Sequence, residues 1–152
     1  MKDLGYFAPT DVGEALKFLA EYGEKATVLA GGTDLVPRIN YYELRPDNLM
    51  DIGKLGLNFI EDKGSMVVVG ATTTWNQVAD STILLEKMGV LTGAAKQGAC
   101  VAVRNAGTIG GNLVNASPAG DLTAVLLALD AELFLKSSDS ERTVPIQDFF
   151  TG

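Results

Sequence analysis

The sequence predicts a mixed α/β fold of the α+β class, with a division near residues 53–56. Before this point, short apolar strand patterns alternate with helix patterns, as in a small parallel β–α–β unit. After it, two strand–turn–strand patterns are mixed with helices. The chain of 152 residues is 47% hydrophobic, which suits a globular core of this size. We therefore expect an N-terminal β–α–β lobe over residues 1–55 and a second α+β lobe over residues 56–152.

The N-terminal lobe is expected to contain one amphipathic helix, two strands and the start of a second helix. The first helix is predicted over residues 10–23, with Thr10 as its N-cap and Gly23 as its stop. The remaining elements follow in order: a buried strand over Ala26–Ala30, a helix start at Leu35 after two glycines, and a strand over Asn48–Ile52.

The second lobe is expected to contain two hairpins and three helices. Thr74 is a plausible cap for a helix that begins at Trp75. The other elements follow from apolar runs and turn residues: a hairpin of Leu57–Glu61 with Ser65–Gly70, a helix over Ile83–Gln97 interrupted at Gly89 and Gly93, a helix over Leu122–Leu129, and a hairpin of Leu133–Lys136 with Arg142–Ile146.

The charge and hydropathy of the chain exclude several kinds of partner. The formal net charge is −7, which argues against nucleic acid and anionic membrane surfaces as ligands. No apolar run approaches the roughly 20 residues of a membrane span, and no signal-peptide pattern is visible. We expect a cytoplasmic protein that binds neither nucleic acid nor membrane.

The chain has no histidine and a single cysteine, Cys100. These two facts exclude histidine-based triads, histidine or cysteine-cluster metal sites, and an internal disulfide. A covalent cofactor link through imidazole is excluded as well. We expect no metal site and no catalytic side chain, and any redox chemistry should belong to a bound cofactor.

Residues 104–121 form the most unusual stretch, which reads Arg-Asn-Ala-Gly-Thr-Ile-Gly-Gly-Asn-Leu-Val-Asn-Ala-Ser-Pro-Ala-Gly-Asp. Four glycines alternate with small polar residues inside an otherwise apolar chain. Glycine allows backbone amides to approach a ligand closely, and successive amides at bends form hollows that bind anions. We interpret the stretch as a polar, flexible loop that forms a binding site.

A second glycine segment follows the strand at Ala26–Ala30, and it leads from strand to glycine turn to helix. This order commonly presents amides to a phosphate. The alternative is a plain strand-to-helix turn that needs Gly31 and Gly32 for its geometry alone. The turn by itself does not decide between the two interpretations.

Together, the two glycine segments suit a long ligand that carries a diphosphate. Neither has the spacing of the P-loop or of the dinucleotide G-x-G-x-x-G fingerprint. Thr33, Thr108 and Asn112 are possible donors to phosphate oxygens, and Asp121 is an acceptor suited to sugar or ribityl hydroxyls. Backbone amides and helix ends supply positive potential without lysine or arginine.

These residues resemble a known family, the FAD-binding subunits of molybdenum hydroxylases such as xanthine dehydrogenase and carbon monoxide dehydrogenase. The resemblance is carried by Leu-Ala-Gly-Gly-Thr-Asp-Leu at 29–35, Arg-Asn-Ala-Gly-Thr-Ile-Gly-Gly-Asn-Leu at 104–113 and Ala-Ser-Pro-Ala-Gly-Asp at 116–121. It implies an FAD-binding fold of the vanillyl-alcohol-oxidase (PCMH) type, in which two α/β lobes hold the cofactor between them.

The resemblance also implies the residues that contact non-covalently bound FAD. In the family, both glycine segments wrap the diphosphate mainly through backbone amides. Carried over to this sequence, the expected cofactor-binding residues are Ala30, Gly31, Gly32, Thr33, Asp34, Leu35, Gly98, Ala99, Thr108, Gly111, Asn112 and Asp121. Asp34 and Asp121 are assigned to hydrogen bonding rather than to acid–base chemistry, and Arg104 is expected to be an orienting or interface residue.

The function that the resemblance implies is electron transfer within a complex. The molybdenum cofactor would lie on a large partner subunit and the [2Fe–2S] centres on a small one, with FAD passing electrons to NAD⁺ or another acceptor. Family members continue beyond the Phe-Phe-Thr-Gly end into a further domain, which this chain is expected to lack. The alternative is a cofactor-free scaffold or assembly fragment that docks the partner subunits.

Overall fold

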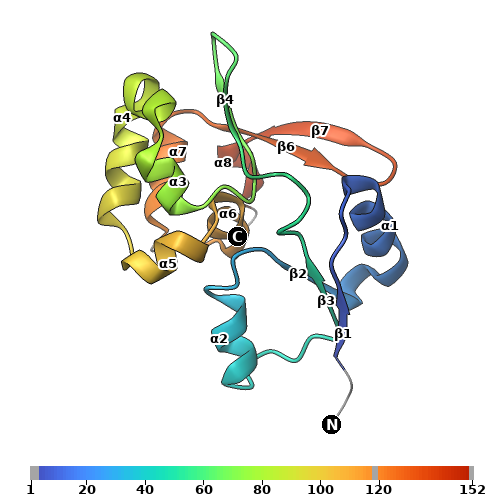
Figure 1. Cartoon of the computed structure of the whole chain (residues 1–152). Coiled ribbons are helices and arrows are strands. Elements are labelled where there is room, and N and C mark those ends of the chain that lie inside the picture. Colours follow the sequence, from blue (N-terminus) through green and yellow to red (C-terminus); the bar gives the residue numbers. More distant parts are fainter. Residues whose placement is uncertain (1–3, 118–119, 151–152) are drawn as a thin grey trace.

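A three-stranded parallel sheet with the order β1–β3–β2 forms the N-terminal part of the protein (Figure 1). The computed structural model describes residues 4–117 and 120–150. The strands are β1 (Gly5–Phe7), β2 (Ala26–Leu29) and β3 (Asn48–Asp51). Both outer strands run parallel to β3, and Gly5 and Ala26 both lie opposite Asn48. The predicted parallel β–α–β unit is confirmed, and β1 is a further strand that the sequence pattern did not reveal.

Helix α1 (Val12–Tyr22) connects β1 to β2, and its cap differs from the prediction. The Asp11 carboxylate accepts the amide of Glu14 at 3.0 Å, so Asp11 is the N-cap and the assignment of Thr10 is wrong. The Thr10 amide instead donates to the Glu14 carboxylate at 3.1 Å. The helix stops at Gly23, as predicted, where φ is +50°, and a 3₁₀ turn (Gly23–Lys25) leads into β2.

Helix α2 (Leu35–Asn40) connects β2 to β3 and completes the second crossover. The carboxyl ends of parallel strands meet at one edge of a sheet, where open α/β folds bind ligands. The loop over residues 30–34 leaves β2 at this edge, and Gly53 follows β3 there. The amide of Ile52 donates to the carbonyl of Leu29 at 2.9 Å and ties the two exits together.

The C-terminal part is built on a cluster of helices, which Figure 1 shows on the opposite side of the molecule from α1. The helices are α3 (Trp75–Asp80), α4 (Thr82–Gln97), α5 (Val101–Ala106), α6 (Ile109–Asn115), α7 (Asp121–Ala128) and the short α8 (Ile146–Phe149). Their shared core contains Trp75, Val78, Ala79, Leu84, Leu91, Ala95, Ile109 and Leu122. None of the helices in the described part of the chain has the length and hydropathy of a membrane span.

Two predicted features of these helices are present. Thr74 and Gln77 form a capping box, in which each side chain accepts the backbone amide of the other residue. Helix α4 is interrupted at Met88, where φ is −144° and ψ is 52°, directly before Gly89. Gly93, the second predicted interruption, stays helical.

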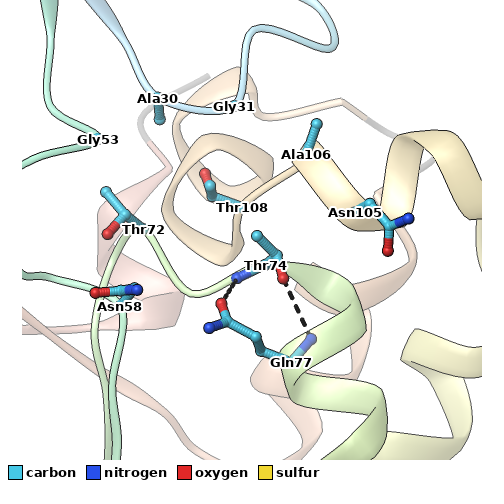
Figure 2. A pocket seen from close by; sticks show the side chains of 10 residues that line it. All are labelled: Ala30, Gly31, Gly53, Asn58, Thr72, Thr74, Gln77, Asn105, Ala106 and Thr108. Atoms are coloured by element: carbon cyan, nitrogen blue, oxygen red, sulfur yellow. Dashed lines mark hydrogen bonds between the residues drawn. The ribbon is translucent and has the colours of Figure 1, made fainter.

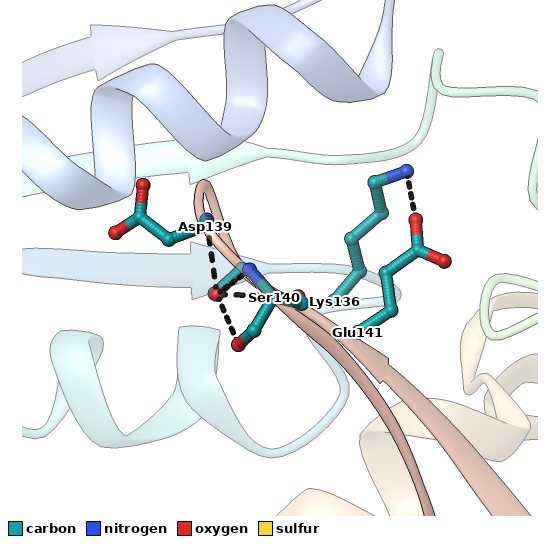
Figure 3. A network of polar contacts seen from close by, with 5 residues as sticks. Lys136, Asp139, Ser140 and Glu141 are labelled. Atoms are coloured by element: carbon teal, nitrogen blue, oxygen red, sulfur yellow. Dashed lines mark hydrogen bonds and ion pairs between the residues drawn. The ribbon is translucent and has the colours of Figure 1, made fainter.

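Both predicted hairpins form; the strands of the first are shorter than expected, whereas those of the second lie within one residue of the predicted bounds. The first pairs β4 (Ile60–Asp62) with β5 (Val67–Val69), and the second pairs β6 (Glu132–Lys136) with β7 (Glu141–Pro145). At the turn of the second hairpin, the Ser137 hydroxyl accepts the amides of Asp139 and Ser140, and Lys136 pairs with Glu141 across the strands (Figure 3).

The interpretation of residues 104–121 as a long flexible loop is wrong, because α5 and α6 occupy most of this stretch. The Thr108 hydroxyl caps α6 by accepting the Gly111 amide at 3.1 Å, and Ile109 and Leu113 bury one face of the helix. A Cβ on Gly110 would lie 2.7 Å from the carbonyl oxygen of Ala71. Glycine is therefore needed here for the close approach of α6 to the turn that follows β5. Pro118 and Ala119, which belong to the motif at 116–121, lie outside the described residues.

Candidate functional site

The two glycine segments meet backbone against backbone. A Cβ on Gly31 would lie 1.9 Å from the carbonyl oxygen of Ala106 and 2.7 Å from its carbonyl carbon. A Cβ on Gly107 would lie 3.3 Å from the Thr33 hydroxyl oxygen. The structure thus brings together the two segments that the sequence paired, and no side chain larger than hydrogen fits at position 31.

A cavity of about 390 Å³ opens beside this contact, a volume within the range of small-molecule sites (Figure 2). It lies between the exits of β2 and β3, the end of the first hairpin, α3, and the junction of α5 with α6. The lining residues are Ala30, Gly31, Gly53, Asn58, Thr72, Thr74, Gln77, Asn105, Ala106 and Thr108. No lining residue carries a charge.

The first segment offers a row of unused amides. The amides of residues 31–35 donate to no acceptor within the part of the chain that the structure describes. The turn is held by the amide of Val36, which donates to the carbonyl of Gly32 at 3.0 Å, and Gly32 has φ of +70°. Successive free amides at such a turn form a hollow with positive potential, which suits a phosphate oxygen.

The second segment differs, because its helix uses most of its own amides. Ile109 and Gly110 donate to the carbonyls of Thr73 and Ala71, each at 2.9 Å, and Gly111 donates to the Thr108 hydroxyl. Within the described residues, the amide of Thr108 has no acceptor. The segment therefore offers the Thr108 amide and side-chain groups to a ligand, rather than a row of amides.

Three further predicted site residues, Gly98, Ala99 and Asp121, lie together and do not line this cavity. A Cβ on Gly98 would lie 2.8 Å from a carboxylate oxygen of Asp121 and 2.5 Å from the Trp75 ring. Ala99, the next residue, has φ of +51°, which is unusual for a residue with a side chain. Asp121 begins α7 and is exposed.

Arg104 holds the turn at Gly98 and Ala99 in place. One terminal nitrogen, Nη1, lies within hydrogen-bond distance of three carbonyl oxygens: Lys96 at 2.9 Å, Ala99 at 3.2 Å and Gly98 at 3.4 Å. These carbonyls end α4, where a cation is favourable to the helix dipole. Arg104 thus has the orienting role expected from the sequence.

The remaining predicted residues connect the site to its surroundings. The Asn112 side-chain oxygen accepts the Thr123 hydroxyl at 3.2 Å and so links α6 to α7. Asp34 faces Arg38 one helical turn later, with 3.8 Å between carboxylate and guanidinium, and both side chains are about half exposed. Asp34 and Asp121 have different neighbours, Arg38 in one case and the Gly98 turn in the other.

Gly53 is held at the cavity by Asp51. One carboxylate oxygen of Asp51 accepts the Gly53 amide at 2.8 Å, and the other accepts the Tyr6 hydroxyl at 2.7 Å. The hydrogen bond to this carboxylate raises the pKa of Tyr6 above its ordinary value of 10.0. Strand β1, which the sequence pattern did not reveal, therefore supports the edge of the site.

Sequence reasoning missed most of the polar side chains in the cavity wall. Asn58, Thr72 and Gln77 come from the end of the first hairpin and from α3, and no motif includes them. The Thr72 hydroxyl is buried and has no hydrogen-bond partner within the described residues. For Thr72 and Gln77 the only available signal was their position near Thr74, which was predicted as a helix cap, and Asn58 had none.

The cavity fits part of a large nucleotide cofactor. Its wall supplies neutral donors and acceptors, and Gly31, which lines it, begins the row of free amides suited to a phosphate group. In accordance with this, residues 2–152 match the model of the FAD binding domain in molybdopterin dehydrogenase, and the chain belongs to this family. The resemblance drawn from the two glycine motifs is confirmed.

Curated relatives carry the same kind of name. The chain is 39% identical to the carbon monoxide dehydrogenase medium chain of Hydrogenophaga pseudoflava, over 97% of this chain and 52% of the relative. It is 32% identical to the xanthine dehydrogenase FAD-binding subunit of Escherichia coli O157:H7, over 97% of this chain and 51% of the relative. The chain thus spans about half the length of the curated relatives it matches.

Solved structures confirm the mixed α/β fold. Carbon monoxide dehydrogenase from Hydrogenophaga pseudoflava, in a form lacking the Mo-pyranopterin moiety of its cofactor, superposes with a TM-score of 0.95 at 39% identity, over 98% of this chain and 52% of that chain. Quinoline 2-oxidoreductase from Pseudomonas putida 86 superposes with a TM-score of 0.94 at 28% identity, over 99% of this chain and 53% of that chain.

Proposed function

We propose that this chain is the FAD-binding, electron-transferring part of a molybdenum hydroxylase. In this proposal a large subunit carries the molybdenum cofactor and a small subunit carries [2Fe–2S] centres. Electrons from these centres reach FAD on this chain and leave to NAD⁺ or another acceptor. Family membership and relatives named carbon monoxide dehydrogenase and xanthine dehydrogenase support the assignment.

The observation that carries the proposal is the row of free amides over residues 31–35, next to a cavity without charged side chains. A chain with a net charge of −7 can hold a diphosphate only where local dipoles offset its overall charge. The amide row supplies that local positive potential and leaves the rest of the wall neutral.

FAD, when bound, supplies the redox chemistry, and the residues of this chain bind and orient it. In our proposal Ala30, Gly31, Gly32, Thr33, Asp34 and Leu35 hold the diphosphate. Thr108 contributes its amide, and Gly111 and Asn112 let α6 approach the diphosphate. Asp121 accepts a hydrogen bond from a sugar or ribityl hydroxyl of FAD, and Gly98 and Ala99 line the surface beside Asp121. No side chain acts as a nucleophile or general base.

We further propose that the site lies at the junction of two lobes, residues 1–55 and 56–152. The contact of Gly31 with Ala106 joins a residue of the first lobe to one of the second. The cavity wall also takes residues from both lobes, with Ala30 and Gly53 on one side and Thr72 and Thr108 on the other.

The decisive experiment is reconstitution of the purified chain with FAD, followed by gel filtration. Retention of the flavin absorbance band at about 450 nm in the protein peak supports the proposal. A protein that folds but stays colourless refutes cofactor binding by this chain. If that colourless protein co-purifies with an iron–sulfur partner, it is a scaffold instead.

The electron acceptor is tested on the same sample under anaerobic conditions. Bleaching of the flavin band by NADH supports NAD⁺ as the acceptor. Bleaching by the reduced iron–sulfur partner, without bleaching by NADH, indicates a different acceptor while keeping the electron-transfer role.

A further inference from the structure

We propose that the outer edge of β6 pairs with the same edge of a second copy of this chain. The two β6 strands would run antiparallel about a two-fold axis at Phe134, and the two hairpins would join into one four-stranded sheet. No residue of β6 lines the cavity beside the glycine segments, so the inference is independent of the proposed function.

The first observation is the direction of the backbone groups in β6. In an antiparallel pair, successive residues alternately turn their amide and carbonyl toward the partner strand and away from it. At the turn end of the hairpin, the Ser137 amide donates to the carbonyl of Ser140 at 2.8 Å. At the open end, the Ile146 amide donates to the carbonyl of Ala131 at 2.9 Å. The odd-numbered residues of β6 therefore bond to β7, and the even-numbered residues turn their backbone groups to the outer edge.

Three residues thus present backbone groups at the outer edge of β6: Glu132, Phe134 and Lys136. Within the described residues, β6 and β7 form a sheet of two strands, and nothing pairs with this edge (Figure 1). An unpaired edge of this kind is a template for another strand. The outer edge of β7 is less suitable, because it contains Pro145, which has no amide to donate.

The second observation is the exposure of the side chains along this edge. Glu132, Phe134 and Lys136 are all exposed, and the exposed fraction of Phe134 is 66%. Protein sheets usually protect a free edge with charges or proline, whereas here an aromatic ring lies between two charges. Pairing with a second copy would place the two Phe134 rings side by side and remove apolar surface from water.

The charges on the edge select one register. When Phe134 lies opposite Phe134 of the second copy, Glu132 of each chain lies opposite Lys136 of the other. Opposite charges stabilise such cross-strand pairs, and like charges destabilise them. A slip of two residues would place Phe134 opposite a charged residue, and a slip of four would place like charges opposite each other. The edge is therefore complementary to itself in the central register.

The existing ion pair of Lys136 is compatible with this arrangement. Lys136 already pairs with Glu141 across the hairpin, as Figure 3 shows. A lysine ammonium has three donors, so it can also bind the Glu132 carboxylate of the second copy. The three outward pairs would add about six backbone hydrogen bonds between the chains.

The size of the contact predicts the strength of the dimer. Strand β6 has five residues, and one strand edge of this length is a small interface. Stable interfaces bury at least roughly 1,200 Å² in total. We therefore expect a weak dimer whose population rises with protein concentration.

The test is sedimentation velocity over a wide range of protein concentrations, with two charge-reversal variants. Glu132→Lys and Lys136→Glu each place like charges opposite each other at both outer pairs. Each variant alone should raise the dimer dissociation constant about tenfold or more. A one-to-one mixture of the two variants should dimerise again, because every outer pair then joins opposite charges. Thermal unfolding of each variant should stay close to that of the wild type, since both side chains are exposed.

Glu86→Lys is the matched control. Glu86 is exposed on α4, away from the β6 edge, and this substitution changes the net charge by the same amount as Glu132→Lys. Both substitutions make the chain less negative, so net charge alone would strengthen association in both. Only Glu132→Lys should weaken it.

Hydrogen exchange of the wild-type chain provides a second measurement. The amides of Glu132, Phe134 and Lys136 should exchange rapidly at low concentration and slowly at high concentration. The amides of Leu133 and Leu135 should exchange slowly at both, because they bond to β7.

Four results would overturn the inference. The first is a wild-type chain that stays monomeric at every concentration. The second is a dimer that persists in both variants, because another surface then holds it. The third is a mixture that stays monomeric, because the register is then wrong. The fourth is protection of the three amides only after an iron–sulfur partner is added, because a different protein then occupies the edge.

Discussion

Gly31→Ala is the most direct perturbation of the contact between the two glycine segments. The added Cβ would lie 1.9 Å from the carbonyl oxygen of Ala106, whereas real Cβ contacts are essentially never shorter than 3.0 Å. The segments must therefore separate by at least 1.1 Å, the difference between these two distances. Both contact atoms are tied to backbone, so rotation of a side chain cannot relieve the clash.

Overpacking of this kind typically costs about 1–3 kcal/mol. If the free protein relieves the clash by parting the segments, binding must close them again, and the same strain opposes binding. Since about 1.4 kcal/mol corresponds to a factor of ten, we expect FAD affinity to fall by roughly 5- to 150-fold. Secondary structure and the helical core should persist, because Gly31 lies outside both.

The assay is titration with FAD, followed by flavin fluorescence, together with thermal unfolding of the free protein. Gly93→Ala is the matched control, because a Cβ there has nothing within 4 Å and the residue lies in α4. It should keep FAD affinity and stabilise the fold by about 0.5–1 kcal/mol. If Gly31→Ala binds FAD as tightly as the wild type, the two segments do not act as one site.

Three further predictions concern the second segment and a surface ion pair. Asp121→Ala should weaken FAD binding about tenfold, through the loss of a charge-assisted hydrogen bond to a hydroxyl; unchanged affinity in the titration would remove Asp121 from the site. Arg104→Gln should lower both the unfolding temperature and FAD affinity because the turn at Ala99 loses its support, and Arg104→Lys should restore part of both. The third prediction is pH-dependent: the hydrogen bond from Lys87 lowers the pKa of Asp62 below its ordinary value of 3.8. This pair stabilises the fold above that value and loses its effect as the pH falls through the lowered pKa. Lys87→Met should therefore be less stable than the wild type near neutral pH, and the two should converge in acid, as urea unfolding at several pH values would reveal.

The elements that sequence patterns identified are those whose signals are local. The Thr74 cap of α3 and the strand, turn and helix around Gly31 depend on residues a few positions apart. Helix α6 was missed because Gly110 and Gly111 each disfavour a helix by about 1 kcal/mol. Tertiary contact overrides this preference, since Gly110 packs closely on Ala71.

The parts of the site that could not be predicted depend on long-range pairing. Strand β1 has three residues and forms only against β3, so no local pattern reveals it. Thr72 and Asn58 reach the cavity because the base of the first hairpin lies beside α6, through the bond from Gly110 to Ala71. The glycine motifs indicated where the ligand binds, but not which neutral side chains complete the wall.

The contact between Gly31 and Ala106 also constrains the order of events during folding. The two residues are far apart in the chain, so the loop that their contact closes is long and forms slowly relative to local helices. During synthesis, residues 31–35 can form their turn before the second glycine segment has been translated. Uptake of the cofactor therefore reports a late step, the contact of the two glycine segments, rather than the formation of either segment.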